Sequence, residues 1–105
     1  MADPAREGDI AKNLRTVEWL KSEMVGGGAQ ALRAMVMGNE DALLDGLATE
    51  IISAYVLTRR LGLGFERLDW KISNKLRLNI EEGHETEKWY GDLSALLSYL
   101  EDRKR

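Results

Sequence analysis

The stretch GNEDALLDGLATEIISAYVLTRRLGLG, residues 38–64, contains a helix pattern together with both of its ends. Asn39 is a good N-cap, and the two carboxylates that follow it lie where the helix dipole favours negative charge. Gly62 supplies the stop at the other end. The middle of the stretch, IISAYVL, is apolar nearly all round. We therefore expect a helix that lies at the centre of the assembly.

Upstream, a second pattern begins at Asp9, another N-cap candidate, and runs to a stop at Gly38. Its apolar residues recur at steps of three and four, the period of an amphipathic helix: Ile10, Leu14, Val17, Leu20, Met24, Leu32, Met35 and Val36. Gly26, Gly27 and Gly28 interrupt it, and each costs a helix interior about 1 kcal/mol relative to alanine. We expect these glycines to end the helix, to kink it, or to clear space beside its backbone.

Two further helices are expected downstream. The first carries Phe65, Leu68, Ile72, Leu76 and Ile80 and ends near Gly83, and the second carries Trp89, Leu93, Leu96, Leu97 and Leu100. Four amphipathic helices with short connections predict an all-α four-helix bundle. Residues 1–8, which contain the only proline, are expected to be a flexible leader, and residues 9–105 to be a single domain.

Composition narrows the classes of function. The net charge of −3 gives no general attraction to phosphates, so no nucleic-acid partner is expected. The absence of cysteine excludes thiolate nucleophiles and cysteine metal sites. The start, MADPAREGD, lacks the apolar run of a signal peptide, and no later segment has the pattern of a membrane span. These features predict a cytoplasmic protein without a membrane partner.

Glu50 is an anomaly in the central helix. At about 100° per residue it falls within the apolar stripe, beside Leu43 and Leu57. An unpaired buried carboxylate is costly, so Glu50 requires a cation, a hydrogen-bond donor or a metal ion. A lysine from a neighbouring helix, or a cleft edge open to water, would also satisfy it.

Three polar side chains form an i, i+4, i+8 line at the border of the next apolar stripe: Lys71, Lys75 and Asn79. A lysine at the rim of a bundle usually extends its head into water. However, this line faces the same way as Glu50 and indicates a polar pocket between the second and third helices. Glu23 flanks the stripe of the first helix, where an ordinary surface glutamate is the alternative interpretation.

The order LKSEMVGGGAQALRAMVMGNEDALLDGLATEIISAYVLTRRLGLGFERLDWKISNKLRLN resembles the MazG-like nucleotide pyrophosphohydrolases. The resemblance covers residues 15–80, and the final segment EEGHETEKWYGDLSALLSYLEDRKR is similar to the tail of a narrower branch found in bacilli. It implies an all-α homodimer or homotetramer. It also implies cleavage of nucleoside triphosphates between the α and β phosphates, with Mg²⁺ held by acidic side chains.

The family's acidic motifs are incomplete in this chain. The E-x-x-D motif of the second helix falls on Gly46 and Thr49 or, after a shift of one residue, on Leu47 and Glu50. The E-E-x-x-E motif of the first helix falls on Glu23, Met24 and Gly27. The resemblance therefore implies Glu23 and Glu50 as metal ligands.

The family's K-x-x-K-N motif is better preserved. It matches either Lys71, Asn74 and Lys75, or Lys75 and Asn79. The resemblance implies that Lys71, Lys75 and Asn79 bind the substrate, and it assigns no catalytic residue. Two carboxylates can hold one Mg²⁺ ion together with water and substrate phosphates, but they do not also supply a general base.

Two functional hypotheses follow. The first is a Mg²⁺-dependent nucleoside triphosphate pyrophosphohydrolase with a depleted acidic site. The second is a non-catalytic helical oligomer that acts as a nucleotide sensor or a protein-interaction module. Under both hypotheses we expect at least a homodimer. The central helix is apolar around most of its circumference, and one four-helix bundle does not bury all of that surface.

Overall fold

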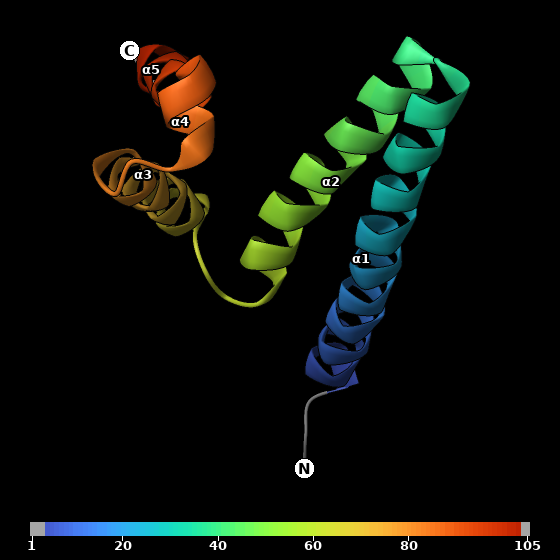
Figure 1. Cartoon of the computed structure of the whole chain (residues 1–105). Coiled ribbons are helices and arrows are strands. Elements are labelled where there is room, and N and C mark those ends of the chain that lie inside the picture. The colour runs from blue at the N-terminus through green and yellow to red at the C-terminus, as the bar shows by residue number, and fades with distance from the viewer. Residues whose placement is uncertain (1–3, 104–105) are drawn as a thin grey trace. The chain divides into compact units, whose positions relative to one another are not determined.

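The computed structural model describes residues 4–103, which form five helices and no strand (Figure 1). The helices are α1 (Pro4–Met37), α2 (Glu40–Arg60), α3 (Phe65–Glu81), α4 (Glu85–Tyr90) and α5 (Asp92–Arg103). The predicted all-α class is therefore confirmed. The chain divides into two compact units, residues 1–65 and 66–105, and each is described by itself. The four-helix bundle, the single domain and the oligomer stay predictions.

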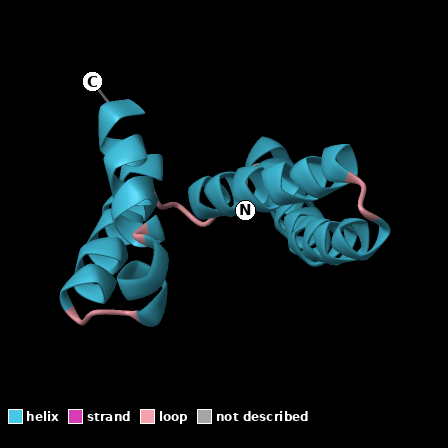
Figure 2. Cartoon of the chain, turned by 45° about the horizontal axis from the view of Figure 1, so that its top comes forward, coloured by secondary structure: helices cyan, strands magenta, loops and turns pink. Residues whose placement is uncertain are grey.

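The first unit is an antiparallel hairpin in which α1 and α2 lie side by side (Figures 1 and 2). The turn between α1 and α2 contains the predicted glycine stop and the predicted asparagine N-cap. Gly38 adopts a φ of 65°, which favours glycine, and the Asn39 side chain accepts a hydrogen bond of 3.1 Å from the amide of Ala42. At the other end of α2, Gly62 has a φ of 85°. The predicted stops and the N-cap of α2 are thus confirmed.

Helix α1 is longer than expected. It begins at Pro4, where the fixed φ of proline suits a first helical turn, rather than at Asp9. The predicted leader is therefore helical from Pro4 to Gly8, while residues 1–3 lie outside the described residues. The helix continues through Gly26, Gly27 and Gly28, none of which has a positive φ. The three glycines therefore do not end the helix, which excludes the first of the three roles expected for them.

The contact between α1 and α2 is made largely by small side chains. The buried residues are Val17, Leu20, Gly27, Ala31, Ala34, Gly46 and Ser53. Several large apolar residues of α1 and α2 are instead exposed in the single chain: Ile10, Leu14, Leu32, Met35, Val36, Leu44, Leu47 and Ile51. These large apolar residues therefore lie outside the α1–α2 contact. The physical reason is that glycine and alanine let the two backbones approach closely, which leaves the larger side chains outside the contact.

In the second unit, α3 follows its predicted stripe, with Leu76 buried and Leu68, Ile72 and Ile80 half-buried. The last predicted helix is wrong in one respect, because Gly91, with a φ of 68°, divides it into α4 and α5. Glu87 of α4 accepts a 3.0 Å hydrogen bond from the amide of Ser94 and another from its hydroxyl. In the described chain, no helix combines the length and the apolar character of a membrane span.

Candidate functional site

The glycines of α1 mark the place where the two helices of the hairpin come closest. A Cβ atom on Gly46 would lie 2.7 Å from the carbonyl oxygen of Gly27 and 2.8 Å from the amide nitrogen of Ala31. A Cβ atom on Gly27 would lie 3.0 Å from the carbonyl oxygen of Gly46. These neighbours are backbone atoms that cannot turn aside. Gly27 and Gly46 are therefore required by the approach of the two helices, and we call this place the glycine crossing.

Glu50 points into the glycine crossing. A Cβ atom on Gly27 would lie 2.8 Å from Glu50 Oε1, and one on Gly28 would lie 3.7 Å from it. This oxygen is buried and has no hydrogen-bond partner in the part of the chain that the structure describes. The sequence thus located the anomalous carboxylate, while the expected lysine or donor partner is not found among the described residues. The glycines provide the space that the carboxylate occupies.

The other predicted site residues lie on both units. Glu23 is half-buried on α1, one helical turn before Gly27. Lys71, Lys75 and Asn79 lie along α3, where both lysines are exposed and Asn79 is half-buried. Neither lysine forms an ion pair or a hydrogen bond within residues 4–103. The metal role of Glu23 and Glu50, and the substrate role of the α3 residues, stay predictions.

The donor set of the glycine crossing can be compared with the needs of Mg²⁺. An orphaned carboxylate oxygen is an available ligand, and one carboxylate can hold Mg²⁺ when water and phosphate complete the shell. Among the described residues, no group of three or more acidic or histidine side chains lies close enough together to hold a metal ion. The crossing therefore fits one ion held largely by water and phosphate, and it does not fit a centre that also needs a carboxylate base.

Gln30 and Gly46 both contribute to the contact between the helices, and the sequence pattern does not predict this role for either residue. Gln30 donates from Nε2 to the carbonyl oxygen of Ala42 at 3.0 Å and to Asp45 Oδ2 at 2.9 Å. For Gly46, the sequence predicts only a position of the acidic motif. A glycine carries no hydrophobic signal, and a glutamine at a helix border resembles a surface residue. The pairing of residues 30 and 42 becomes visible only when the hairpin is formed.

Comparison with sequence models of known families assigns this all-helical chain to a class. The sequence model of the MazG-like family matches residues 10–93. The match covers most of the chain, and the protein belongs to the MazG-like family. Comparisons with curated proteins and with solved structures gave no match.

Proposed function

We propose that this MazG-like protein has no efficient hydrolytic centre and acts as a self-assembling interaction module. The observation that carries the proposal is the contact of Gly27 with Gly46. By resemblance, Gly27 falls on an acidic position of the first motif, and Gly46 falls on one in the first of the two possible registers of the second motif, yet their backbones are too close to admit side chains. Because Gly27 also faces Thr49, the motif positions converge in space without their carboxylates. Among the three described atoms closest to a Cβ on Gly27, Glu50 Oε1 is the one that belongs to an acidic side chain.

The outer surface of the hairpin supports assembly. On α2, Leu44, Leu47 and Ile51 are 63%, 45% and 60% exposed and lie at helical spacing on one side. On α1, Leu32 and Val36 are 67% and 88% exposed. Large apolar side chains that gather on a surface mark an interaction site. The partner we propose is a second copy of this chain, in a homodimer or homotetramer.

Pyrophosphate release tests the absence of efficient hydrolysis. The purified chain is incubated with Mg²⁺ or Mn²⁺ and a panel of ribo- and deoxyribonucleoside triphosphates. We expect no release above that of buffer. Turnover that the variant Glu50→Gln removes would overturn this part of the proposal, because it would identify a working acidic site. Turnover that survives in Glu50→Gln and co-elutes with this chain in gel filtration would also overturn it, because it would identify a hydrolytic centre that does not use Glu50.

Light scattering tests the assembly. We expect a mass of at least twice 11.9 kDa at micromolar concentration. Ile51→Lys places a charge on the exposed apolar side of α2 and should shift the protein toward the monomer. Ala11→Lys adds the same charge at an exposed position elsewhere and should leave the mass unchanged. A monomeric wild-type protein would overturn the assembly proposal.

A second candidate, Mg²⁺-dependent binding of a nucleoside triphosphate, is favoured by two observations. Glu50 Oε1 has no partner among the described residues, and the cations of Lys71 and Lys75 are unpaired there. When bound, Mg²⁺ would neutralise phosphate charge, with Glu50 and Glu23 as its carboxylates. By the family resemblance, this candidate assigns Lys71, Lys75 and Asn79 of α3 to the phosphates of the substrate.

Calorimetry distinguishes this candidate from the first. Each triphosphate is titrated into the full chain with and without Mg²⁺. The candidate requires binding that depends on Mg²⁺, that weakens at least tenfold in Glu50→Gln and that also weakens in Lys75→Gln. Arg15→Gln, at an exposed position of α1, serves as the charge-matched control. Binding that is absent in the wild type, or equal in all variants, eliminates the candidate.

A further inference from the structure

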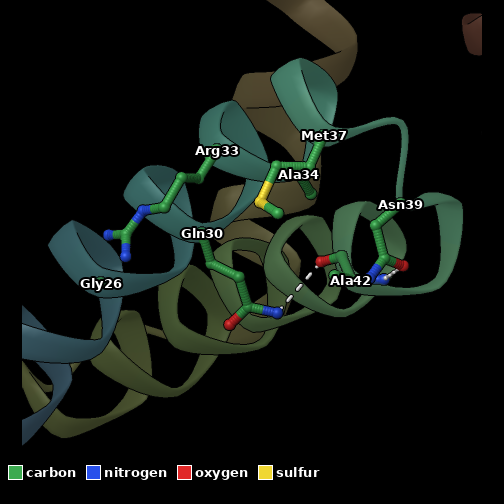
Figure 3. A pocket seen from close by; sticks show the side chains of 7 residues that line it. All are labelled: Gly26, Gln30, Arg33, Ala34, Met37, Asn39 and Ala42. Atoms are coloured by element: carbon green, nitrogen blue, oxygen red, sulfur yellow. Dashed lines mark hydrogen bonds between the residues drawn. The ribbon is translucent and has the colours of Figure 1, made fainter.

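The closed end of the hairpin contains a hollow that the proposed function does not use (Figure 3). Its volume is about 360 Å³, which lies near the lower end of the range for small-molecule sites. Its wall is formed by Gly26, Gln30, Arg33, Ala34, Met37, Asn39 and Ala42. A few polar groups around an apolar surface are typical of a site for a small organic ligand.

Among the described residues that line the hollow, Arg33 is the only charged one. Its side chain extends along α1 toward Gly26 (Figure 3), and the rest of the described chain offers it no ion pair or hydrogen bond. A Cβ atom on Gly26 would meet no atom within 4 Å, so the space beside the guanidinium is open. A free guanidinium presents paired N–H donors that match the two oxygens of a carboxylate.

The remaining polar groups are held in fixed positions. Both hydrogens of Gln30 Nε2 are used by Ala42 and Asp45, which leaves Oε1 as an acceptor. Asn39 Oδ1 accepts from the amide of Ala42 at 3.1 Å, which leaves Nδ2 as a donor. The Asp45 carboxylate does not line the hollow and is partnered by Gln30. The charge presented to a ligand is therefore the single positive charge of Arg33.

The apolar part of the wall consists of Ala34, Ala42 and Met37. The flexible thioether of methionine adapts to irregular ligands and makes favourable contacts with aromatic rings. We propose that the hollow binds a small aromatic carboxylate, with the carboxylate on Arg33 and the ring against Met37 and Ala34. A single cation matches one negative charge and not a triphosphate, so this site is distinct from the nucleotide site considered above.

An NMR titration of the full chain tests the proposal. Benzoate is the probe, benzamidine has the same ring with the opposite charge, and benzamide is neutral. Benzoate should shift the amide resonances of Gly26, Gln30 and Asn39 in a saturable manner and bind at least tenfold more tightly than benzamidine. Arg33→Gln should weaken benzoate binding at least fivefold, to the level of benzamide. Arg15→Gln should leave it unchanged.

A second variant fills the hollow without disturbing the hairpin. Gly26→Leu adds a side chain where a Cβ atom meets nothing, and leucine is a better helix former than glycine. Benzoate binding should be lost while the helical circular dichroism is retained. Equal affinity for benzoate and benzamidine, or unchanged binding in Arg33→Gln, would overturn the proposal. A failure of every probe to shift these amides would also overturn it, and a second copy of the chain would then be the occupant to test.

Discussion

The α1–α2 hairpin and the α3–α5 unit hold their helices together in different ways. In the hairpin, two backbones meet at Gly27 and Gly46. The other unit also buries an apolar residue, Leu76, but its helices are linked in addition by exposed polar side chains, since Arg77 of α3 pairs with Glu101 of α5. Contacts of the first kind depend on volume, and contacts of the second kind depend on charge. Stability of the hairpin should therefore respond to single methyl groups, and links in the other unit should respond to salt and pH.

The largest effect is expected at Leu20, whose side chain is 1% exposed and is the largest that is fully buried. Leu20→Ala removes buried apolar volume and leaves a cavity, which should lower the free energy of unfolding by about 3 kcal/mol. Urea unfolding followed by circular dichroism measures the change. Leu14→Ala, at a 61% exposed position outside the proposed assembly surface, should cost less than about 0.5 kcal/mol. Equal losses in the two variants would contradict the core assigned to the hairpin.

Gly46→Ala tests the glycine crossing directly. The new methyl group would lie 2.7 Å from the carbonyl oxygen of Gly27, so the helices must separate. We expect a loss of about 2 kcal/mol, although alanine is the better helix former. Gly26→Ala is the matched control, because its methyl group meets nothing within 4 Å. It should raise the free energy of unfolding by up to about 1 kcal/mol. A gain in both variants would show that the helices are not in close contact.

The ends of the helices could be predicted because their causes are local. Asn39 caps α2 through an amide three residues away, and Gly38 and Gly62 adopt the positive φ that a helix stop requires. Gly91 acts in the same way and breaks the last helix, but the apolar spacing on both of its sides concealed it. Local chemistry thus predicts a helix end well where no apolar pattern continues across it.

The glycine crossing could not be predicted because it depends on two segments at once. The helical wheel places the Glu50 carboxylate within an apolar stripe. The burial of Glu50 Oε1 agrees with that position. The same wheel favoured Leu32 and Val36 over Ala31 and Ala34, because larger side chains dominate any hydrophobic pattern. Burial shows the reverse: Ala31 and Ala34 are each 5% exposed. Which face of a helix is buried depends on the size of the residues on the helix that packs against it. The sequence of one helix alone does not contain that information.

In the α3–α5 unit, Arg77→Gln should have a smaller effect. The Arg77 and Glu101 side chains are 56% and 43% exposed, so water and salt screen their attraction. The loss should stay below about 1 kcal/mol and should vanish in about 1 M salt. Thermal melts at low and high salt measure it, with Arg67→Gln as a control at an exposed arginine of the same helix. A loss that is independent of salt would point to packing of the Arg77 stem instead.

The smallest effect is a change in the titration of Glu87. The pKa of this carboxyl lies below its ordinary value of 4.5, chiefly because the Ser94 hydroxyl donates to it and next because the Ser94 amide does. A carboxyl with a depressed pKa in the folded state stabilises the fold above its unfolded pKa, and this contribution is lost as the pH falls through the folded value. Ser94→Ala removes the hydroxyl and keeps the amide, so the pKa of Glu87 should rise only part of the way toward 4.5. Carboxyl NMR between about pH 2 and pH 7 follows this titration.

Ser98→Ala, at an exposed serine of α5, should leave the Glu87 pKa unchanged. If Ser94→Ala also leaves it unchanged, the hydroxyl contributes nothing, and the link between α4 and α5 rests on the backbone alone.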